Sequence, residues 1–224
     1  CVSTFYSYIT KGVFRFLTNA DLPEKSKKKR KYKKVKTMKR PPRGESIEKR
    51  PAEVDTRETF GHWEGDTVYS KKDGSKALFV LTERLTREEI IMRIKDRTAE
   101  SVIKALDRIE RKCGPVLFRK IFRTITVDNG GEFSDVDRLE RSAIRKTLKR
   151  TKVYFCHPYS SYERGSNECQ NKMIRRPFPK GTDFGNVTDA EVARAESWMN
   201  NYPRKILGWK TSEMLFREYV AALI

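Results

Sequence analysis

The sequence predicts an α/β fold in which a mixed sheet of five strands carries helices on both faces. Three observations support this. The chain has 224 residues, 37% of them hydrophobic, which is enough to fill one sizeable core. Segments with strand and helix patterns follow one another in the order βββ-α-β-α-β-α. Turn-forming residues and prolines separate these segments.

Three strand-like segments open the globular part of the chain. Glu64–Ser70 and Ala77–Thr82 are separated by the turn sequence Lys72-Asp73-Gly74-Ser75, and Glu88–Ile94 follows. They predict an antiparallel meander of three strands.

Helices and further strands alternate after the meander. Residues 98–112 carry apolar residues at the spacing of a helix with one buried face, and Thr98 is placed to cap it. The elements that we predict next are a strand at Ile121–Val127, a helix at Ser134–Lys149, a strand at Lys152–Cys156, and a helix at Ser161–Arg176 that Pro177 ends. This order is that of a ribonuclease H-like domain.

Four regions are predicted along the chain: a helical N-terminal region (1–20), a basic linker (21–56), the core (57–182) and a C-terminal helical extension (183–224). A short helix at Val2–Leu17 lies in the first. Two helices, Thr188–Asn200 and Thr211–Ala222, lie in the last. The apolar side chains of this extension either pack its helices together or form a subunit interface.

The charge balance favours nucleic acid as the partner. The formal net charge is +19, and twelve of the Lys and Arg residues lie in Lys25–Arg43 without any acid. That run is either a solvated connector or an arm that binds phosphates without sequence preference. Its candidate DNA-binding residues are Lys28, Lys29, Arg30 and Lys31.

The remaining composition predicts a soluble, intracellular protein. The four cysteines have no C-x-x-C spacing, so we expect free thiols and no structural metal. No apolar run is long enough to span a membrane, and no apolar segment with a cleavage site opens the chain.

Three acidic residues stand where different elements can bring them together. Asp66 lies in the first strand, Asp128 follows the fourth, and Glu168 lies in the helix after the fifth. A single aspartate after a strand is more often a turn former, but the first and fourth strands of this topology are neighbours. Because clustered carboxylates repel one another, a site that gathers three of them requires divalent cations. Mg²⁺ and Mn²⁺ suit oxygen ligands, and we expect two ions when DNA is bound. Phosphodiester cleavage and strand transfer are the expected chemistry.

Glu163 competes with Glu168 for the third position. Glu168, Asn171 and Arg175 are spaced to share one helix face, which can bind metal with the acid and DNA with the other two. Glu163 precedes Gly165 at the helix entrance, where a cap or a salt bridge is expected. The candidate DNA-binding residues of this helix are Arg164, Asn171, Lys172, Arg175 and Arg176, whose alternative is a solvated basic face.

Three aromatic residues near these acids have two interpretations each. His62 and Trp63 precede the first acid and could line the site, although packing in the core is favoured for Trp63. His157 either contacts DNA or caps the fifth strand.

Several motifs resemble the DDE transposases of the IS-thirty insertion-sequence family. They are TFGHWEGDTV at residues 59–68, VDNG at 127–130, RGSNECQN at 164–171, IRR with FPKGT within 174–182, and NNYPRKILGWKT at 200–211. The match runs from Arg57 nearly to the end of the chain. It departs from the family pattern at Pro177 and in a longer segment around residues 135–150, where we expect a surface insertion.

The resemblance implies an integrase-type catalytic core with Asp66, Asp128 and Glu168 as catalytic acids and metal ligands. It also implies cleavage at terminal inverted repeats, transfer of the 3′ end to target DNA, and a homo-oligomer in the DNA complex. The place of action that it implies is the cytoplasm, on the bacterial nucleoid. Residues 1–20 would be the remnant of a helix-turn-helix region. Two alternatives stay open: a non-catalytic DNA-binding derivative that represses the element, and a general ribonuclease H-like nuclease.

Overall fold

The computed structural model describes residues 1–22, 44–71, 76–158 and 160–224, except for the side chains of Ser161, Tyr162 and Glu168. The predicted turn at residues 72–75 and the basic residues Lys28, Lys29, Arg30 and Lys31 lie outside the described residues. The chain divides into two units, Cys1–Thr37 and Met38–Ile224, and each is described by itself.

The described part of the first unit is built on one helix, α1 (Val2–Thr10). It ends earlier than the predicted Leu17, because Gly12 adopts a left-handed φ of 70° that breaks the helical path. Beyond this turn Phe14 folds back against Phe5, with ring centroids 5.3 Å apart. Ile9 is buried.

The second unit is organised around a mixed sheet with the strand order β3-β2-β1-β4-β5. β1 pairs antiparallel with β2, which pairs antiparallel with β3, while β4 is parallel to both β1 and β5. The meander and the five-stranded mixed sheet are therefore confirmed. The strands are β1 (His62–Tyr69), β2 (Ala77–Glu83), β3 (Glu89–Ile94), β4 (Thr124–Val127) and β5 (Lys152–Phe155).

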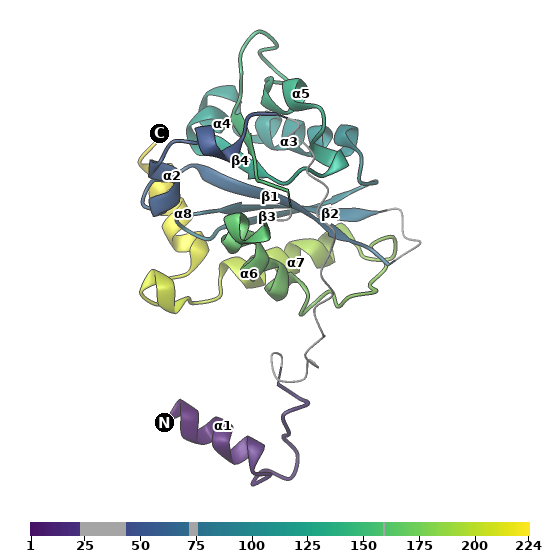
Figure 1. The fold of residues 1–224 in the computed structure, drawn as a ribbon, viewed down its shortest axis with the longest axis vertical. Helices are drawn as coiled ribbons and strands as arrows, with labels where there is room; N and C mark the ends of the chain where they lie inside the picture. The colour runs from purple at the N-terminus through teal and green to yellow at the C-terminus, as the bar shows by residue number, and fades with distance from the viewer. Residues whose placement is uncertain (23–43, 72–75, 159) are drawn as a thin grey trace. The chain divides into compact units, whose positions relative to one another are not determined.

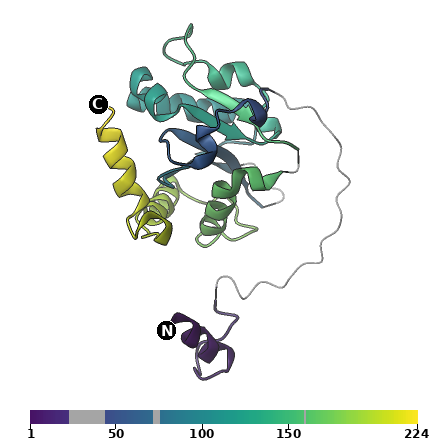
Figure 2. The same cartoon turned by 60° about the vertical axis from the view of Figure 1, so that its left-hand side comes forward.

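Helices cover both faces of the sheet, as predicted (Figure 1). One face carries α3 (Ala99–Cys113), α4 (Pro115–Ile121) and α5 (Val136–Glu140), and the other carries α6 (Gly165–Ile174) and α7 (Asp189–Asn200). The remaining elements are α2 (Glu53–Thr56), α8 (Ser212–Ala221) and the 3₁₀ helices Ile47–Lys49, Gly131–Phe133, Ser161–Arg164 and Lys205–Leu207. Figure 2 shows α8 lying along one side of the unit.

Trp63 anchors the core between the sheet and α3, α4 and α5. It is fully buried and stacks on Phe122 with ring centroids 4.5 Å apart. Its Nε1 donates to the carbonyl of Ile121 at 2.8 Å, which satisfies the one polar atom of the indole. Phe216 of α8 meets the indole edge-on at 5.9 Å. The interpretation of Trp63 as a packing residue is confirmed.

A separate core fills the opposite face, where α6 and α7 lie. Val68 of β1 and Val80 of β2 pack there with Ile174 of α6 and Val192 of α7. Because strand residues alternate between faces, Glu64 and Asp66 point to the same side as Val68. The sheet therefore presents two carboxylates toward α6.

Two predicted elements of the second unit are wrong. The predicted strand at Ile121–Val127 begins only at Thr124, since Gly114 and Pro115 start a helix that runs through Ile121. The predicted helix at Ser134–Lys149 stops at Glu140, the last residue of α5. Glu110 of α3 binds the segment that follows, accepting from the amide of Ala143 at 2.8 Å and contacting Ser142 Oγ, so this segment cannot continue as a helix.

Residues 44–56, part of the predicted linker, pack against the sheet. Ser46 forms a parallel bridge with Phe155, and Arg50 Nη1 donates to Thr126 Oγ1 at 2.9 Å. Val54 is buried. Among the described residues, no helix is long and apolar enough to cross a membrane.

Candidate active site

Asp66 and Asp128 lie beside one another on the face of the sheet that carries α6. β1 and β4 are parallel neighbours, with Glu64 opposite Thr126. Asp66 in β1 and Asp128, which directly follows β4, each lie two residues beyond this pair. The amide of Thr67 donates to Asp66 Oδ1 at 2.9 Å. The amide of Gly130 donates to Asp128 Oδ1 at 2.8 Å. Backbone amides therefore fix the orientation of both carboxylates.

The guanidinium of Arg164 binds both aspartates. Nη2 lies 2.9 Å from Asp128 Oδ2, and Nη1 lies 3.4 Å from Asp66 Oδ1 and donates to the carbonyl of Gly65 at 2.9 Å. Arg164 is only 9% exposed, so this cation is held inside the site. The structure thus places a predicted DNA-binding residue against the predicted acids.

Helix α6 contributes a further contact through Asn171. Its Nδ2 donates to Asp66 Oδ2 at 2.6 Å. Glu168 lies three residues earlier on α6, one helical turn from Asn171, and its side chain is outside the described residues. The backbone therefore brings the helix that carries the third predicted acid to the pair formed by the other two.

Burial raises the pKa of Asp66 above its ordinary value, and the charge of Asp128 adds to this effect. Arg164, the amide of Thr67 and Asn171 act in the opposite direction. Gathering the two carboxylates is therefore unfavourable by itself, and nearby positive charge offsets it. Such a pair favours the binding of cations.

Glu64 is a buried acid beside the site that the sequence pattern did not identify. Its carboxylate is fully buried beside α6. Oε2 accepts from the amide of Asn167, the third residue of α6, at 2.8 Å, and Oε1 accepts from Arg84 Nη1 at 2.6 Å. The first amides of a helix have no partner within the helix, and the side chain of the residue before α6 does not accept from them. Glu64 of β1 caps one of these amides instead.

The other candidate residues of this helix divide into two kinds. Lys172 and Arg176 are exposed and can reach a ligand from solvent. Arg175 instead ties α6 to the end of β1, since its Nη2 donates to the carbonyl of Tyr69 at 3.0 Å.

Glu163 forms a salt bridge, the role expected of it. Its carboxylate binds His157 twice, at 2.9 Å to the backbone amide and at 2.7 Å to Nδ1. His157 Nε2 also lies 3.2 Å from Glu48 Oε1. Hence Glu163 and His157 form a pair of their own at the entrance to α6.

His62 lies at the start of β1, away from the aspartates. The side chain is buried, and Nδ1 lies 2.8 Å from Thr124 Oγ1. Burial is the main cause that lowers the pKa of His62 to about 4, and Arg123 and Arg84 act in the same direction. The hydrogen bonds to Glu163 and Glu48 raise the pKa of His157.

We expect the two histidines to titrate on opposite sides of the ordinary value of about 6.5. NMR spectra of the imidazole protons will show one titration near pH 4, from His62, and one above 6.5, from His157. Between pH 6.5 and 4 the unfolded chain binds a proton at position 62 that the folded chain does not, so this group lowers the free energy of unfolding by up to about 3 kcal/mol as pH falls.

The variant His157→Gln assigns the two signals, because it removes one and leaves the other. It leaves only the His62 signal, which must still titrate near pH 4. Titration of His62 near 6.5 would show that its imidazole is not buried as described.

Comparisons with known proteins agree with this geometry. Residues 56–161 match the family model described as integrase core domain. The chain is 34% identical over 214 residues to the probable transposase for insertion-like sequence element IS1161 of Streptococcus salivarius, covering 95% of this chain and 57% of that protein. It is 35% identical over 179 residues to the transposase InsI for insertion sequence element IS30C of Escherichia coli (strain K12), covering 80% and 43%.

A solved structure shows the same fold. The catalytic core domain of BIV integrase matches with a TM-score of 0.51 at 16% sequence identity, covering 73% of this chain and 98% of that chain. Together with the sheet order, this likeness confirms the predicted ribonuclease H-like fold. The chain spans about half the length of the curated relatives that it matches. Residues 56–161 are thus similar to integrase core domains, and most of the chain is similar to the transposases of insertion sequences such as IS1161 and IS30C.

Proposed function

We propose that the chain is a DDE transposase that cuts DNA at the ends of its element and joins the 3′ ends to target DNA. Asp66, Asp128 and Glu168 are its catalytic acids, and residues 57–182 form its catalytic core. The observation that carries the proposal is the pair of carboxylates on adjacent strands that shares one bound cation, the guanidinium of Arg164. The similarity to insertion-sequence transposases supports it.

The residues of the site fit a divalent metal. Asp66 and Asp128 offer hard oxygen donors, and their pairing with Arg164 favours positive charge at this position. Asp66, Asp128 and Glu168 would hold Mg²⁺ or Mn²⁺. When bound, the ions would supply Lewis-acid stabilisation of the charge that develops on the phosphodiester.

The chain's own residues position the reaction. Asn171 and the amide of Thr67 hold both oxygens of Asp66 in place, and the amide of Gly130 does so for Asp128. Lys172 of α6 and Arg176, which follows the end of this helix, are exposed and would contact phosphates on either side of the scissile bond. DNA held by such contacts binds less tightly as salt rises.

The proposed partners are the terminal inverted repeats and the target duplex. We propose that copies of the chain assemble as a homo-oligomer on this DNA, since insertion of the element requires both of its ends to be joined to the target. The basic run Lys25–Arg43 would bind phosphates without sequence preference.

The test is cleavage and joining of labelled end DNA by the full chain with Mg²⁺ or Mn²⁺. Cutting at the 3′ end and joining to a second duplex, both abolished by chelation, are the expected results. Binding of ends without any cutting would favour the repressor alternative. Equal cutting of RNA–DNA hybrids that carry no element end would favour a general nuclease.

A further inference from the structure

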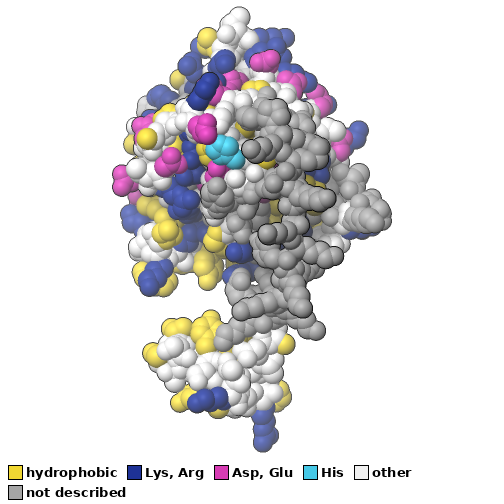
Figure 3. Space-filling model, in the orientation of Figure 1, with side chains coloured by type: hydrophobic (Ala, Val, Ile, Leu, Met, Phe, Trp, Pro, Cys, Tyr) yellow, Lys and Arg dark blue, Asp and Glu magenta, His cyan; other side chains and the backbone are white. Residues whose placement is uncertain are grey.

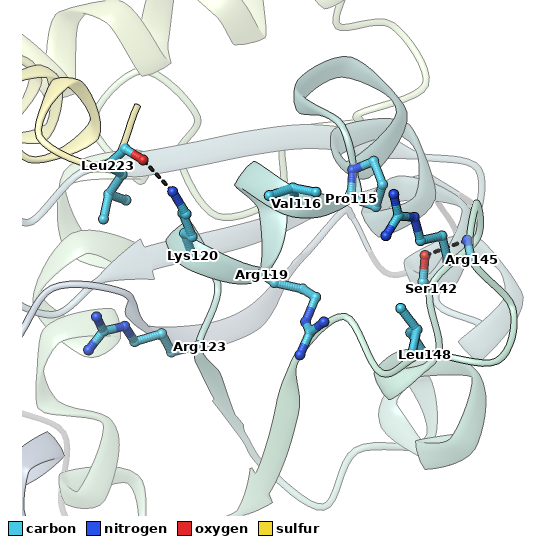
Figure 4. A pocket seen from close by; sticks show the side chains of 9 residues that line it. All are labelled: Pro115, Val116, Arg119, Lys120, Arg123, Ser142, Arg145, Leu148 and Leu223. Carbon is cyan, nitrogen blue, oxygen red and sulfur yellow. Dashed lines mark hydrogen bonds between the residues drawn. The ribbon is translucent and has the colours of Figure 1, made fainter.

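We propose a second DNA-binding site at the start of β4, in a basic cavity that takes the phosphodiester backbone. The cavity has a volume of about 510 Å³ and lies between α4, the segment 142–148 and Leu223, which follows α8 (Figure 4). This inference rests on the proposed function, since it assumes that the chain handles DNA, and it names a DNA-binding surface outside the acid pair.

Four cationic side chains line the cavity, and none of its lining residues is acidic. Arg119 and Lys120 come from α4, Arg123 from the turn before β4, and Arg145 from the segment that follows α5. All four are exposed. Lys120 Nζ donates to the carbonyl of Leu223, while the three guanidinium groups form no ion pair with any described residue. Their charge is therefore available to a ligand.

Acids close to the cavity are already neutralised. Glu110 pairs with Arg150 Nη1 at 3.3 Å. Glu140 pairs with Lys149 Nζ at 2.6 Å and with Lys152 Nζ at 3.4 Å. These acids therefore do not cancel the positive charge of the cavity.

The walls of the cavity are apolar and firmly held. Val116 and Leu148 contribute hydrocarbon to the lining, and a low-dielectric wall strengthens the field of the charges beside it. Glu110 fixes one side through Ala143 and Ser142, and the amide of Arg145 donates to Ser142 Oγ at 2.9 Å. The segment that carries Arg145 is therefore anchored in the fold.

A repeating polyanion fits this surface better than a single acidic side chain. A second cavity of about 190 Å³ shares Ser142 with the first, and Arg141 and Lys146 line it without ion pairs to described residues. Asp107 lines it too, but its carboxylate is paired with Arg150 and Arg111. Figure 3 shows Lys and Arg side chains, with Asp and Glu side chains among them, around the top of the larger unit, where the segment after α5 lies in Figure 1. The cations thus continue from one cavity to the next, as the phosphates of a DNA strand do.

The site is separate from the acid pair. Arg123 precedes β4 and Asp128 follows it, so the two lie at opposite ends of this strand, about 16 Å apart at the usual rise per residue. DNA in the cavity would be held away from the reacting phosphodiester. It would be either an outer part of the same duplex or a second duplex.

The test compares two triple variants with equal reduction in charge. Arg119→Gln, Arg123→Gln and Arg145→Gln together remove three of the four positive charges of the cavity. Arg108→Gln, Arg194→Gln and Lys205→Gln together remove three exposed cations, also without ion pairs to described residues, from other elements.

Binding of a labelled duplex longer than two helical turns is measured against salt concentration. The cavity variant should lower the slope of log K against log salt by about 0.9 for each phosphate that it no longer neutralises, and the control variant by less than about one in total.

Equal slopes for the two variants would overturn the proposal. So would a cavity variant that binds DNA like the control but no longer binds labelled poly-glutamate, because the occupant would then be an acidic protein segment. Cleavage of a short duplex that reaches only the acid pair is measured alongside. Absence of that cleavage in the unmodified chain counts against the proposed function, whereas the two binding slopes still decide the cavity.

Discussion

Asp66→Asn and Asp128→Asn are each expected to reduce cleavage and joining of end DNA by roughly 10³-fold or more. Asparagine keeps the size of the side chain and the Oδ1 atom that accepts from the amide of Thr67 or Gly130. It removes the charge that holds cations at the site. The measurement is the single-turnover cleavage rate at saturating DNA, in Mg²⁺ and again in Mn²⁺.

Glu163 provides the matched control for the third acid. Glu168→Gln should lower the cleavage rate as much as the aspartate variants do. Glu163→Gln alters only the pair with His157, so its cleavage rate should stay within a few-fold of that of the unmodified chain. Thermal unfolding of each variant checks the fold, because Asp128→Asn leaves Arg164 with one carboxylate fewer. The assignment fails if a folded aspartate variant retains its rate, or if Glu163 and Glu168 exchange behaviour.

Much of the fold follows from local sequence pattern. The apolar runs of β2 and β3 indicate strands, and the spacing of apolar residues in α3 indicates a helix. Tertiary contacts agree with these local patterns. Neighbouring strands then bring Asp66 and Asp128 together by topology alone. Elements whose local pattern and buried contacts agree are predictable from the sequence.

The sequence-based predictions fail where a residue distant in the sequence determines the local structure. Residues 134–149 contain good helix formers, but Glu110 binds Ser142 and Ala143 and ends the helix at Glu140. The pattern around Arg164 indicates a basic helix entrance, and nothing local shows that its guanidinium turns inward to two carboxylates. These contacts join residues far apart in sequence, so periodicity does not record them.

Glu64 likewise makes contacts with residues far apart in sequence, and its replacement is expected to have the second large effect on the cleavage rate. Glu64→Gln is expected to lower the cleavage rate by roughly 10- to 100-fold, the usual cost of losing a group that orients a metal ligand. Two donors meet the Glu64 carboxylate, the amide of Asn167 and Arg84 Nη1, and a glutamine has one acceptor oxygen for both. The start of α6 therefore shifts, and with it the backbone of Glu168.

The measurement separates positioning from stability. Because Glu64 is fully buried, it cannot touch DNA, so we expect kcat to fall and the metal concentration for half-maximal rate to rise, while KM for DNA changes little. Glu83→Gln is the matched control, since the Glu83 carboxylate is equally buried and also accepts from backbone amides, those of Gly61 and Leu85, but caps no amide of α6. Both variants should lower the unfolding temperature, and only Glu64→Gln should shift the metal dependence. If the two variants lose rate in parallel with stability and keep the same metal midpoint, Glu64 supports the fold and does not position the third acid.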